Sequence, residues 1–287
     1  MTIAITGASG HLGRATAELV LQAVDPREVV LTTRRPELLA DLAARGAEVR
    51  RVDFADPSTL DDAFVAVDRL LLISTDAVGA RLDPQRDAIA AAAKAGVRHI
   101  VYTSVPEPVA DNPALVVADH AGTEQALSDS TVQWTVLRNN VYAHMQAPGI
   151  EHAIASGRLV TNGGNGATAY VTREDCAAAA AAVLTQDGHE GMTYDVTGPE
   201  ALSGADLAAL AGELGGRPVE LVSVDDDTFA AGLREAGLPD EVAELVASFG
   251  ASTRNGYLAK VSTAVADLTG RQPTALAAVV AAIRTSA

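Results

Sequence analysis

The chain of 287 residues contains a single cysteine, Cys176, and only 3% of its residues are aromatic. One cysteine cannot form an internal disulfide, which fits a reducing compartment, so we expect a cytoplasmic protein. Because aromatic rings are scarce, the core must come mainly from Ala, Val and Leu, which dominate the 48% hydrophobic content. Neither Cys176 nor the six histidines show the spacing of a metal site, so we expect no metal.

Lysine is also scarce, since Lys94 and Lys260 are the only two in the chain. Many short-chain dehydrogenases transfer protons through a Tyr-x-x-x-Lys pair, in which the lysine lowers the pKa of the tyrosine. Here the residues four positions before the lysines are Ala90 and Gly256, so that relay is absent. Alcohol dehydrogenation and nucleotide-sugar epimerisation by that route are not expected. A quinone suits what remains, because its reduction gives a stabilised hydroquinone anion that can take its proton from water.

Excess positive charge and long apolar runs are missing as well. The formal net charge is −16 and the pI is near 4.7, which argues against nucleic acid or an anionic membrane surface as a partner. The alanine run 177–182 is flanked by charges and is too short to cross a bilayer, so we expect no membrane insertion. No leader is expected before the first strand, which begins near residue 2. An anionic cofactor must therefore be held by local groups against an unfavourable overall field.

The N-terminal segment has the pattern of a dinucleotide-binding βαβ unit. The apolar run 3–6 has the length of a strand and stops at Gly7, and the apolar residues then follow a helical period. In the intervening GxxGxxG turn, Gly7 allows a sharp bend, Gly10 lets the backbone approach a pyrophosphate, and Gly13 allows close packing of helix and strand. The helix N-terminus would attract the phosphate. The predicted contacts of this turn are Gly7, Ser9, Gly10, His11, Leu12 and Gly13.

A second strand, 28–33, runs into Arg34 and Arg35, where the adenosine ribose of a bound dinucleotide would lie. Two guanidinium groups suit a 2′-phosphate, so the predicted cofactor is NADP(H) rather than NAD. The alternative is a solvated loop that holds no ligand. At the end of the third strand, Asp53 could accept a hydrogen bond from the adenine amino group while Phe54 packs alongside. The alternative for Asp53 is that it caps the following turn.

Alternation of apolar strands with helical segments predicts an α/β fold, a Rossmann-type doubly wound parallel sheet with right-handed crossovers. The predicted strands of this sheet are 3–6, 28–33, 48–52, 69–74, 99–104, 132–138 and a late strand, 192–196. The predicted helices around it are 12–23, 36–45, 60–67, 83–95, 119–128 and 173–184. The segment 105–117, which contains three prolines, is predicted to be a loop.

The composition beyond residue 198 predicts a smaller, mainly helical C-terminal lobe that covers the mouth of the cofactor cleft. The predicted elements there are helices at 203–214, 239–249 and 274–284, a helix beginning at 225, and a strand at 218–224. Residues 1–140 are predicted to form the NAD(P)-binding domain and residues 141–287 the substrate-covering lobe. Within that lobe, about 168–197 is expected to pack back onto the Rossmann sheet.

Side chains expected near the nicotinamide follow the C-terminal ends of the strands. Ser74 is predicted to lie over the cofactor. Ser104 stands where a short-chain dehydrogenase keeps its serine, but it could instead bond only loop backbone. His120, early in a helix, could stabilise charge or donate a proton, or simply pack in the core. Asn139 and Tyr142, after the sixth strand, could position nicotinamide or substrate, or make loop hydrogen bonds alone.

Eight segments, spread in order over almost the whole chain, resemble those of a known protein family. They are ITGASGHLG (5–13), RLLLIS (69–74), VYTS (101–104), DHAGTE (119–124), TVLRNNVY (135–142), TREDCAAAAAAVL (172–184), HEGMTYDVTG (189–198) and FAAGLREAGLP (229–239). These segments resemble the NmrA-like, atypical short-chain dehydrogenase/reductase family, and within it the flavin-free NADPH:quinone oxidoreductases of type 2. The resemblance implies an NADPH-bound Rossmann domain, a small C-terminal lobe and hydride transfer to quinones.

By position, the resemblance assigns phosphate contacts to Gly7, Gly10, Gly13 and Arg34, and it places Ser74 beside the cofactor and Asn139 and Tyr142 in the pocket. Two departures stand out. His144 and Met145 occupy positions where the family often has Glu-Asn, which affects the substrate preference. Arg35 replaces a frequent Asn and strengthens the expectation of NADP.

Two other functions remain open on the same scaffold. One is a reductase of dyes or other conjugated electrophiles, and the other is an NADP-binding redox-sensing regulator without turnover. A regulator can lose the acceptor cavity, whereas an enzyme needs open space over the nicotinamide. The glycine-rich segment 163–166 is expected to be a mobile rim, which favours the enzyme. The sequence defines neither the particular quinone nor the oligomeric state.

Overall fold

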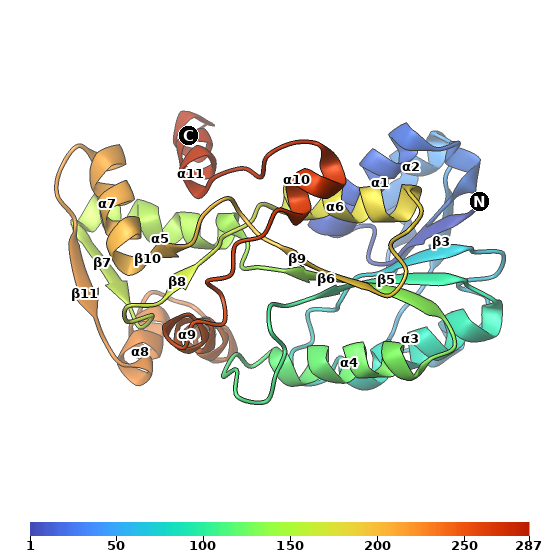
Figure 1. Cartoon of the computed structure of the whole chain (residues 1–287), viewed down its shortest axis with the longest axis horizontal. Helices are drawn as coiled ribbons and strands as arrows, with labels where there is room; N and C mark the ends of the chain where they lie inside the picture. The colour runs from blue at the N-terminus through green and yellow to red at the C-terminus, as the bar shows by residue number, and fades with distance from the viewer. Residues whose placement is uncertain (287) are drawn as a thin grey trace.

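A seven-stranded parallel sheet forms the centre of the computed structural model, which describes residues 1–286 (Figure 1). Its strand order is β3-β2-β1-β4-β5-β6-β9, so the chain leaves β1 in one direction and returns to extend the sheet in the other. The strands are β1 (Ile3–Ile5), β2 (Val29–Thr33), β3 (Glu48–Arg51), β4 (Arg69–Leu72), β5 (His99–Ser104), β6 (Gln133–Asn139) and β9 (Met192–Val196). The predicted Rossmann-type doubly wound fold is confirmed.

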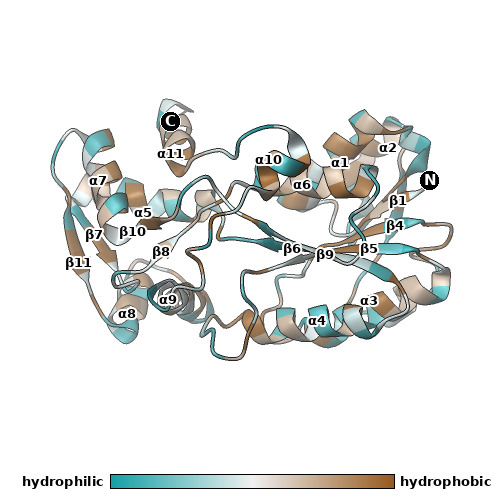
Figure 2. Ribbon diagram, viewed as in Figure 1, coloured by the Kyte–Doolittle hydropathy of each residue, from teal (hydrophilic) through white to brown (hydrophobic). Residues whose placement is uncertain are grey.

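Helices cover both faces of this sheet, as a parallel sheet with apolar strands requires. One face carries α1 (His11–Ala23), α2 (Ala40–Ala44), α6 (Arg173–Thr185) and α10 (Ala264–Thr269), and the other carries α3 (Leu82–Ala95) and α4 (Val117–Asp129) (Figure 1). In Figure 2, α3 and α4 both show brown and teal segments, and the buried residues of α4 include the polar Asp119, His120 and Thr123. Cys176 is buried in the core on the α6 side.

The C-terminal lobe lies at one end of the sheet, beyond the carboxyl ends of the strands (Figure 1). Its helices are α5 (Ala143–Ser156), α7 (Gly204–Gly215), α8 (Asp226–Glu235), α9 (Asp240–Arg254) and α11 (Leu276–Ser286). Two small sheets join them: β7 (Arg158–Thr161) pairs with β11 (Glu220–Ser223), and β8 (Ala167–Thr168) pairs with β10 (Leu202–Ser203). A separate apolar cluster holds α5, α7 and α11 together.

The predicted helix over 60–67 is wrong. A short 3-10 helix, Pro57–Leu60, is followed by turns in which Ala66 has a φ of +61°. Leu60 and Phe64 are still buried against the sheet, but they reach it from turns stabilised by bonds such as Ala63 N–H to the Leu60 carbonyl at 3.2 Å. The apolar contacts of Leu60 and Phe64, rather than a local helical period, therefore decide the conformation of this segment.

Other differences are smaller. The predicted helix 36–45 divides into a 3-10 helix, Pro36–Leu39, and α2. Helix α5 was not predicted, because its Pro148-Gly149 pair is typical of a turn. The division of the chain at residue 140 stays a prediction, although β9 and α6, which fall within 168–197, belong to the layers of the central sheet. Within residues 1–286, no helix has both the length and the apolarity needed to cross a bilayer.

Candidate cofactor and acceptor site

The glycine turn joins β1 to α1 with very close backbone packing. Gly7 has a φ of +59°, in the left-handed region that favours glycine. A Cβ at Gly13 would lie 2.4 Å from the Gly7 carbonyl oxygen, so no side chain fits there without moving backbone. Gly10 is the N-cap of α1 and supplies no side-chain cap, which leaves the first N–H groups of the helix available. These are the features of a phosphate cradle.

The same turn is tied to the end of β2 by a hydrogen bond between the hydroxyls of Ser9 and Thr33, at 2.7 Å. Thr33 Oγ1 also accepts a bond from the backbone N–H of Arg35, at 3.1 Å. The two predicted arginines, Arg34 and Arg35, are therefore held beside the turn. Both are exposed, and within residues 1–286 neither guanidinium has a hydrogen-bond or ion-pair partner.

A third guanidinium, which the sequence analysis missed, belongs to this edge. Arg51 ends β3 directly opposite Thr33 in the parallel register, and it is exposed. Across the described residues it has no ion-pair partner either. By contrast, Arg14 on α1 is paired with Asp41 and Glu18. Uncompensated positive charge at one edge of a chain with a net charge of −16 suits an anionic group that approaches from solvent.

Asp53 and Phe54 lie next to this edge. The Asp53 Oδ1 accepts a bond from the Ala55 N–H at 3.1 Å, so the carboxylate does cap the following turn. Its backbone N–H donates to Thr59 Oγ1 at 2.9 Å. Phe54 packs, partly buried, against the apolar cluster on the α3 side. The capping alternative therefore accounts for one oxygen of Asp53, and its adenine contact stays a prediction.

The five residues predicted near the nicotinamide line one cavity of about 170 Å³, which we call the acceptor cavity. It lies at the carboxyl ends of β4, β5 and β6, where parallel α/β sheets hold their ligands. Helix α9 closes it with Phe249, and Leu258 follows on the next segment. The predicted residues on its wall are Ser74, Ser104, His120, Asn139 and Tyr142.

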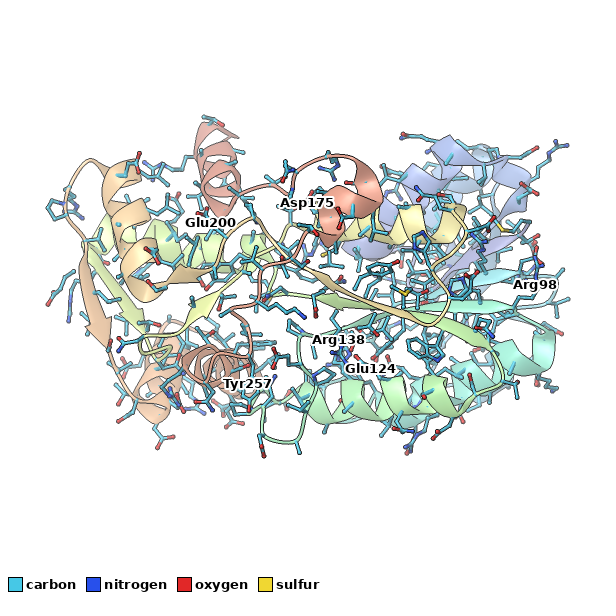
Figure 3. All side chains as sticks on the ribbon, viewed as in Figure 1. Arg98, Glu124, Arg138, Asp175, Glu200 and Tyr257 are labelled. Atoms are coloured by element: carbon cyan, nitrogen blue, oxygen red, sulfur yellow. The ribbon has the colours of Figure 1, made fainter. Side chains whose placement is uncertain are left out.

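The two serines are already engaged. Ser104 Oγ donates to Glu124 Oε1 at 2.6 Å, and Glu124 also forms a two-pronged ion pair with Arg138 between the sheet and α4 (Figure 3). Ser104 thus bonds a side chain rather than loop backbone, and its proton is committed to a carboxylate. The Ser74 N–H donates to Thr103 Oγ1 at 3.0 Å, and its own hydroxyl accepts from Thr103 at 3.4 Å.

His120 is buried between two fixed partners. Its Nε2 lies 3.2 Å from Arg81 Nη1, and its Nδ1 lies 2.8 Å from the Tyr102 hydroxyl. Arginine can only donate, so Nε2 accepts and the ring hydrogen sits on Nδ1. Burial, assisted by the Arg81 charge, lowers the pKa of His120 to about 3. His120 is therefore neutral, and its geometry suits holding Arg81 rather than giving a proton to a ligand.

Arg81 is the residue that the sequence analysis missed in this cavity. Only 5% of it is exposed, and its Nε makes no hydrogen bond although it lies 3.4 Å from Asp119 Oδ2. Burial lowers the pKa of Arg81 and Asp119 opposes that shift, but a guanidinium keeps its charge in proteins. Arg81 is also the N-cap of α3, where a cation faces the positive end of the helix dipole. The structure alone shows this placement, because the sequence pattern begins the helix at residue 83.

Asn139 and Tyr142 form the opposite wall. Asn139 is 6% exposed, and its Oδ1 is buried without a hydrogen-bond partner, so it can accept from an amide N–H of a ligand. Burial raises the pKa of the Tyr142 phenol, which makes it a poor acid. The Tyr142 ring stacks on His144, with centroids 5.5 Å apart, and Arg173 lies 5.5 Å from the same ring centre. Burial, assisted by Arg173, lowers the pKa of His144 to about 4.

The cavity therefore combines one buried cation with phenol and imidazole groups whose shifted pKa values keep them from acting as acids. In the described part of the chain, no group of three or more His, Cys, Asp or Glu side chains is arranged to hold a metal. The glycine-rich segment expected to be a mobile rim packs against α9 instead. A Cβ at Gly166 would lie 1.9 Å from the Thr253 carbonyl oxygen.

A family model for NAD(P)H-binding proteins matches residues 7–187 of this chain, which is more than half of it. The chain belongs to the NAD(P)H-binding family. The match begins at the glycine turn and extends through α6, so it includes the cradle and the acceptor-cavity residues of β4 to β6. The predicted family membership is confirmed.

Several proteins similar to this NAD(P)H-binding chain are named as reductases or oxidoreductases. Quinone oxidoreductase 2 of Escherichia coli K12 is 38% identical over 96% of both chains. A Streptomyces griseus reductase of (4-alkanoyl-5-oxo-2,5-dihydrofuran-3-yl)methyl phosphate is 36% identical over 94% of this chain and 93% of its own. Among solved structures, the E. coli NADPH-dependent quinone oxidoreductase complexed with NADPH has a TM-score of 0.94 at 36% identity, covering 99% of this chain and 100% of that one.

Proposed function

We propose that the protein is an NADPH-dependent reductase that delivers hydride to quinone-like, conjugated carbonyl acceptors. The observation that carries this proposal is the acceptor cavity itself. It offers a fixed positive charge, Arg81, beside groups that are poor proton donors. A carbonyl that must be protonated as it is reduced would find no effective proton donor in this cavity. An acceptor whose reduced form is a stabilised anion needs no such donor, and the positive charge of Arg81 stabilises that anion.

The cofactor half of the proposal rests on the exposed edge of the sheet. The glycine turn would hold the pyrophosphate, and Gly13 leaves the space that a Cβ would fill. Arg34 and Arg35 would bind the 2′-phosphate, and Arg51 would add to the same positive field. Asn139 Oδ1 would accept from the carboxamide of the nicotinamide, since it is buried and unpartnered. Bound NADPH would supply the hydride.

The protein's own contribution to the chemistry is electrostatic. Arg81 stabilises the negative charge that appears on the acceptor oxygen, in a site that excludes most water. His120 and Asp119 hold Arg81 in place from two sides. The proton reaches the hydroquinone anion from water after the hydride has moved. The names of the relatives agree with this chemistry, because quinones and the alkanoyl butenolide are both conjugated carbonyl compounds.

Dye reduction is the nearest alternative on the same scaffold. A structure of a triphenylmethane reductase from Citrobacter complexed with NADP(H) has a TM-score of 0.90 at 31% identity, covering 98% of this chain and 99% of that one. A cationic dye would meet the Arg81 charge, which disfavours it here. A regulator without turnover is supported less, because the cavity beside the predicted nicotinamide position is open.

The proposal is tested by anaerobic oxidation of NADPH with no added flavin. A panel of benzoquinones, naphthoquinones and cationic dyes is offered to the purified full chain. We expect stoichiometric hydroquinone formation with the quinones and slower reaction with the dyes. Tight binding of NADPH without consumption by any acceptor would favour the regulator instead.

A further inference from the structure

A second cavity, of about 140 Å³, lies in the C-terminal lobe next to the acceptor cavity. We call it the side cavity. Elements that are far apart in the chain enclose it: α5, β7, β10, α7, α8 and α9 each contribute lining residues. Six apolar side chains line the side cavity but not the acceptor cavity: Leu159, Val160, Leu202, Leu207, Phe229 and Val246.

The two cavities share a partition. Val141, Met145 and Phe249 line both of them, so these three side chains lie at the border between the acceptor cavity and the side cavity. Met145 is 48% exposed, and its unbranched thioether chain can adopt several rotamers at low cost. A ligand group attached to an acceptor ring could therefore pass from one space into the other.

The side chains that line the side cavity carry no charge, and most of their polar groups already have partners. No Asp, Glu, Lys, Arg or His lines it. Its hydroxyls already have partners: Thr168 bonds Thr253 at 2.9 Å, and the Tyr170 hydroxyl donates to Gln146 Oε1 at 3.4 Å. The Asn162 amide nitrogen donates to Asp226 and to the Ala247 carbonyl, at 2.7 and 2.8 Å. An apolar group gains most by entering, because it leaves water without displacing a hydrogen bond.

We propose that the side cavity is a subsite for an apolar alkyl substituent of the acceptor. The conjugated ring lies in the acceptor cavity near Arg81, and the chain passes Met145 and Phe249 into the apolar space beyond. This inference rests on the proposed function for the identity of the ring. The cavity is small, so it selects short chains and takes up only the first few carbons of a longer one.

Equilibrium binding tests the subsite apart from turnover. The full chain is saturated with NADP⁺, which has no hydride to give, and a quinone series with n-alkyl chains of increasing length is titrated by calorimetry. Each buried methylene is expected to lower Kd by up to about fourfold until the cavity is full, after which Kd levels off. A Kd independent of chain length overturns the proposal. A Kd that keeps falling with length also overturns it, because the chain then lies in open contact with the surface.

Two substitutions on α9 test whether the alkyl chain of the ligand lies in the side cavity. Val246→Trp fills the side cavity from a position that does not touch the acceptor cavity, and it is expected to remove the gain from the chain, about tenfold or more. Val242→Trp is the matched control, because Val242 lies one turn earlier on the same helix, is 41% exposed and lines neither cavity. Val242→Trp should leave the ratio of Kd for the chain-free quinone to Kd for the alkylated quinone unchanged. Equal behaviour of both variants overturns the assignment.

Turnover with NADPH separates this inference from the proposed function. If the chain-free quinone is reduced and the alkylated quinones are not preferred, the proposed reductase function stands and the proposed alkyl subsite is overturned. Chain-dependent binding that Val246→Trp abolishes, with no reduction of any quinone, upholds the subsite and removes the reductase. With both correct, kcat/KM follows the same length dependence as binding.

Discussion

The proposed adenine end of the site, around the glycine turn and the tip of β2, is exposed. It offers backbone N–H groups and guanidinium groups that have no partner within residues 1–286. The acceptor cavity is lined mostly by buried side chains, and its cation, Arg81, contacts His120 and Asp119. The residues of the adenine end lie close together in the sequence, within one βαβ unit. The acceptor cavity is assembled from five separate segments of the chain. Changes at the first end should therefore alter which nucleotide binds, and changes at the second should alter what happens to it.

The largest effect is expected at the adenine end. Replacing Arg34 and Arg35 together with alanine should weaken NADPH binding roughly 100-fold, because two charge-assisted phosphate contacts are lost. NADH binding should change little, and Kd values for both nucleotides measured by fluorescence titration check this. Arg45→Ala is the control, since Arg45 is also exposed and without an ion pair but lies at the end of α2. Equal loss for NADPH and NADH would refute the 2′-phosphate assignment.

The acceptor end should respond in the opposite way. Arg81→Met combined with Asp119→Asn avoids leaving a buried carboxylate unpaired. It should lower kcat about 100-fold with the Kd of NADPH unchanged, because only the charge formed during reaction loses its partner. Steady-state kinetics with one quinone measures this. Arg86→Met on the exposed side of α3 serves as the control. A kcat within a few-fold of the original protein would show that Arg81 is structural.

Folding should depend on the closest backbone contact in the cradle. Gly13→Ala places a Cβ 2.4 Å from the Gly7 carbonyl oxygen and should lower the free energy of unfolding by about 3 kcal/mol. Gly232→Ala on α8 is the matched helical control, because nothing lies within 4 Å of the added Cβ. It should raise stability by about 1 kcal/mol. Denaturant unfolding of both variants distinguishes a specific contact from a general intolerance of glycine replacement.

The smallest effect is a pH dependence of stability at the acceptor end. His120 has a folded-state pKa of about 3, and the unfolded value is about 6.5, so below pH 6.5 the unfolded chain takes up a proton that the folded chain refuses. His120 should therefore cost about 2 kcal/mol of stability between pH 7 and pH 5. His120→Gln should reduce that slope, measured by denaturant unfolding at each pH. An unchanged slope would contradict the burial of a neutral His120 ring in the folded protein.

These two ends also explain how far the sequence alone could lead. The glycine turn, Arg34 and Arg35 were predictable because neighbouring residues form them, and Ser74, Ser104 and Asn139 were predictable because strand ends meet at one edge. Arg51 and Arg81 were not, since Arg51 joins the edge only through the register with Thr33 and Arg81 enters the cavity from a loop. The segment 60–67 failed for a related reason, because contacts of Phe64 with the sheet outweigh local helical period.

The most direct test of the account is a pair of isotope effects under anaerobic single-turnover conditions. We predict a clear primary isotope effect on the rate when the transferred hydrogen of NADPH is deuterated. Heavy water as solvent should give almost no effect, since Arg81 stabilises an anion that is protonated later. A solvent effect as large as the primary one would show that a proton moves together with the hydride. That result would contradict a cavity without a working acid.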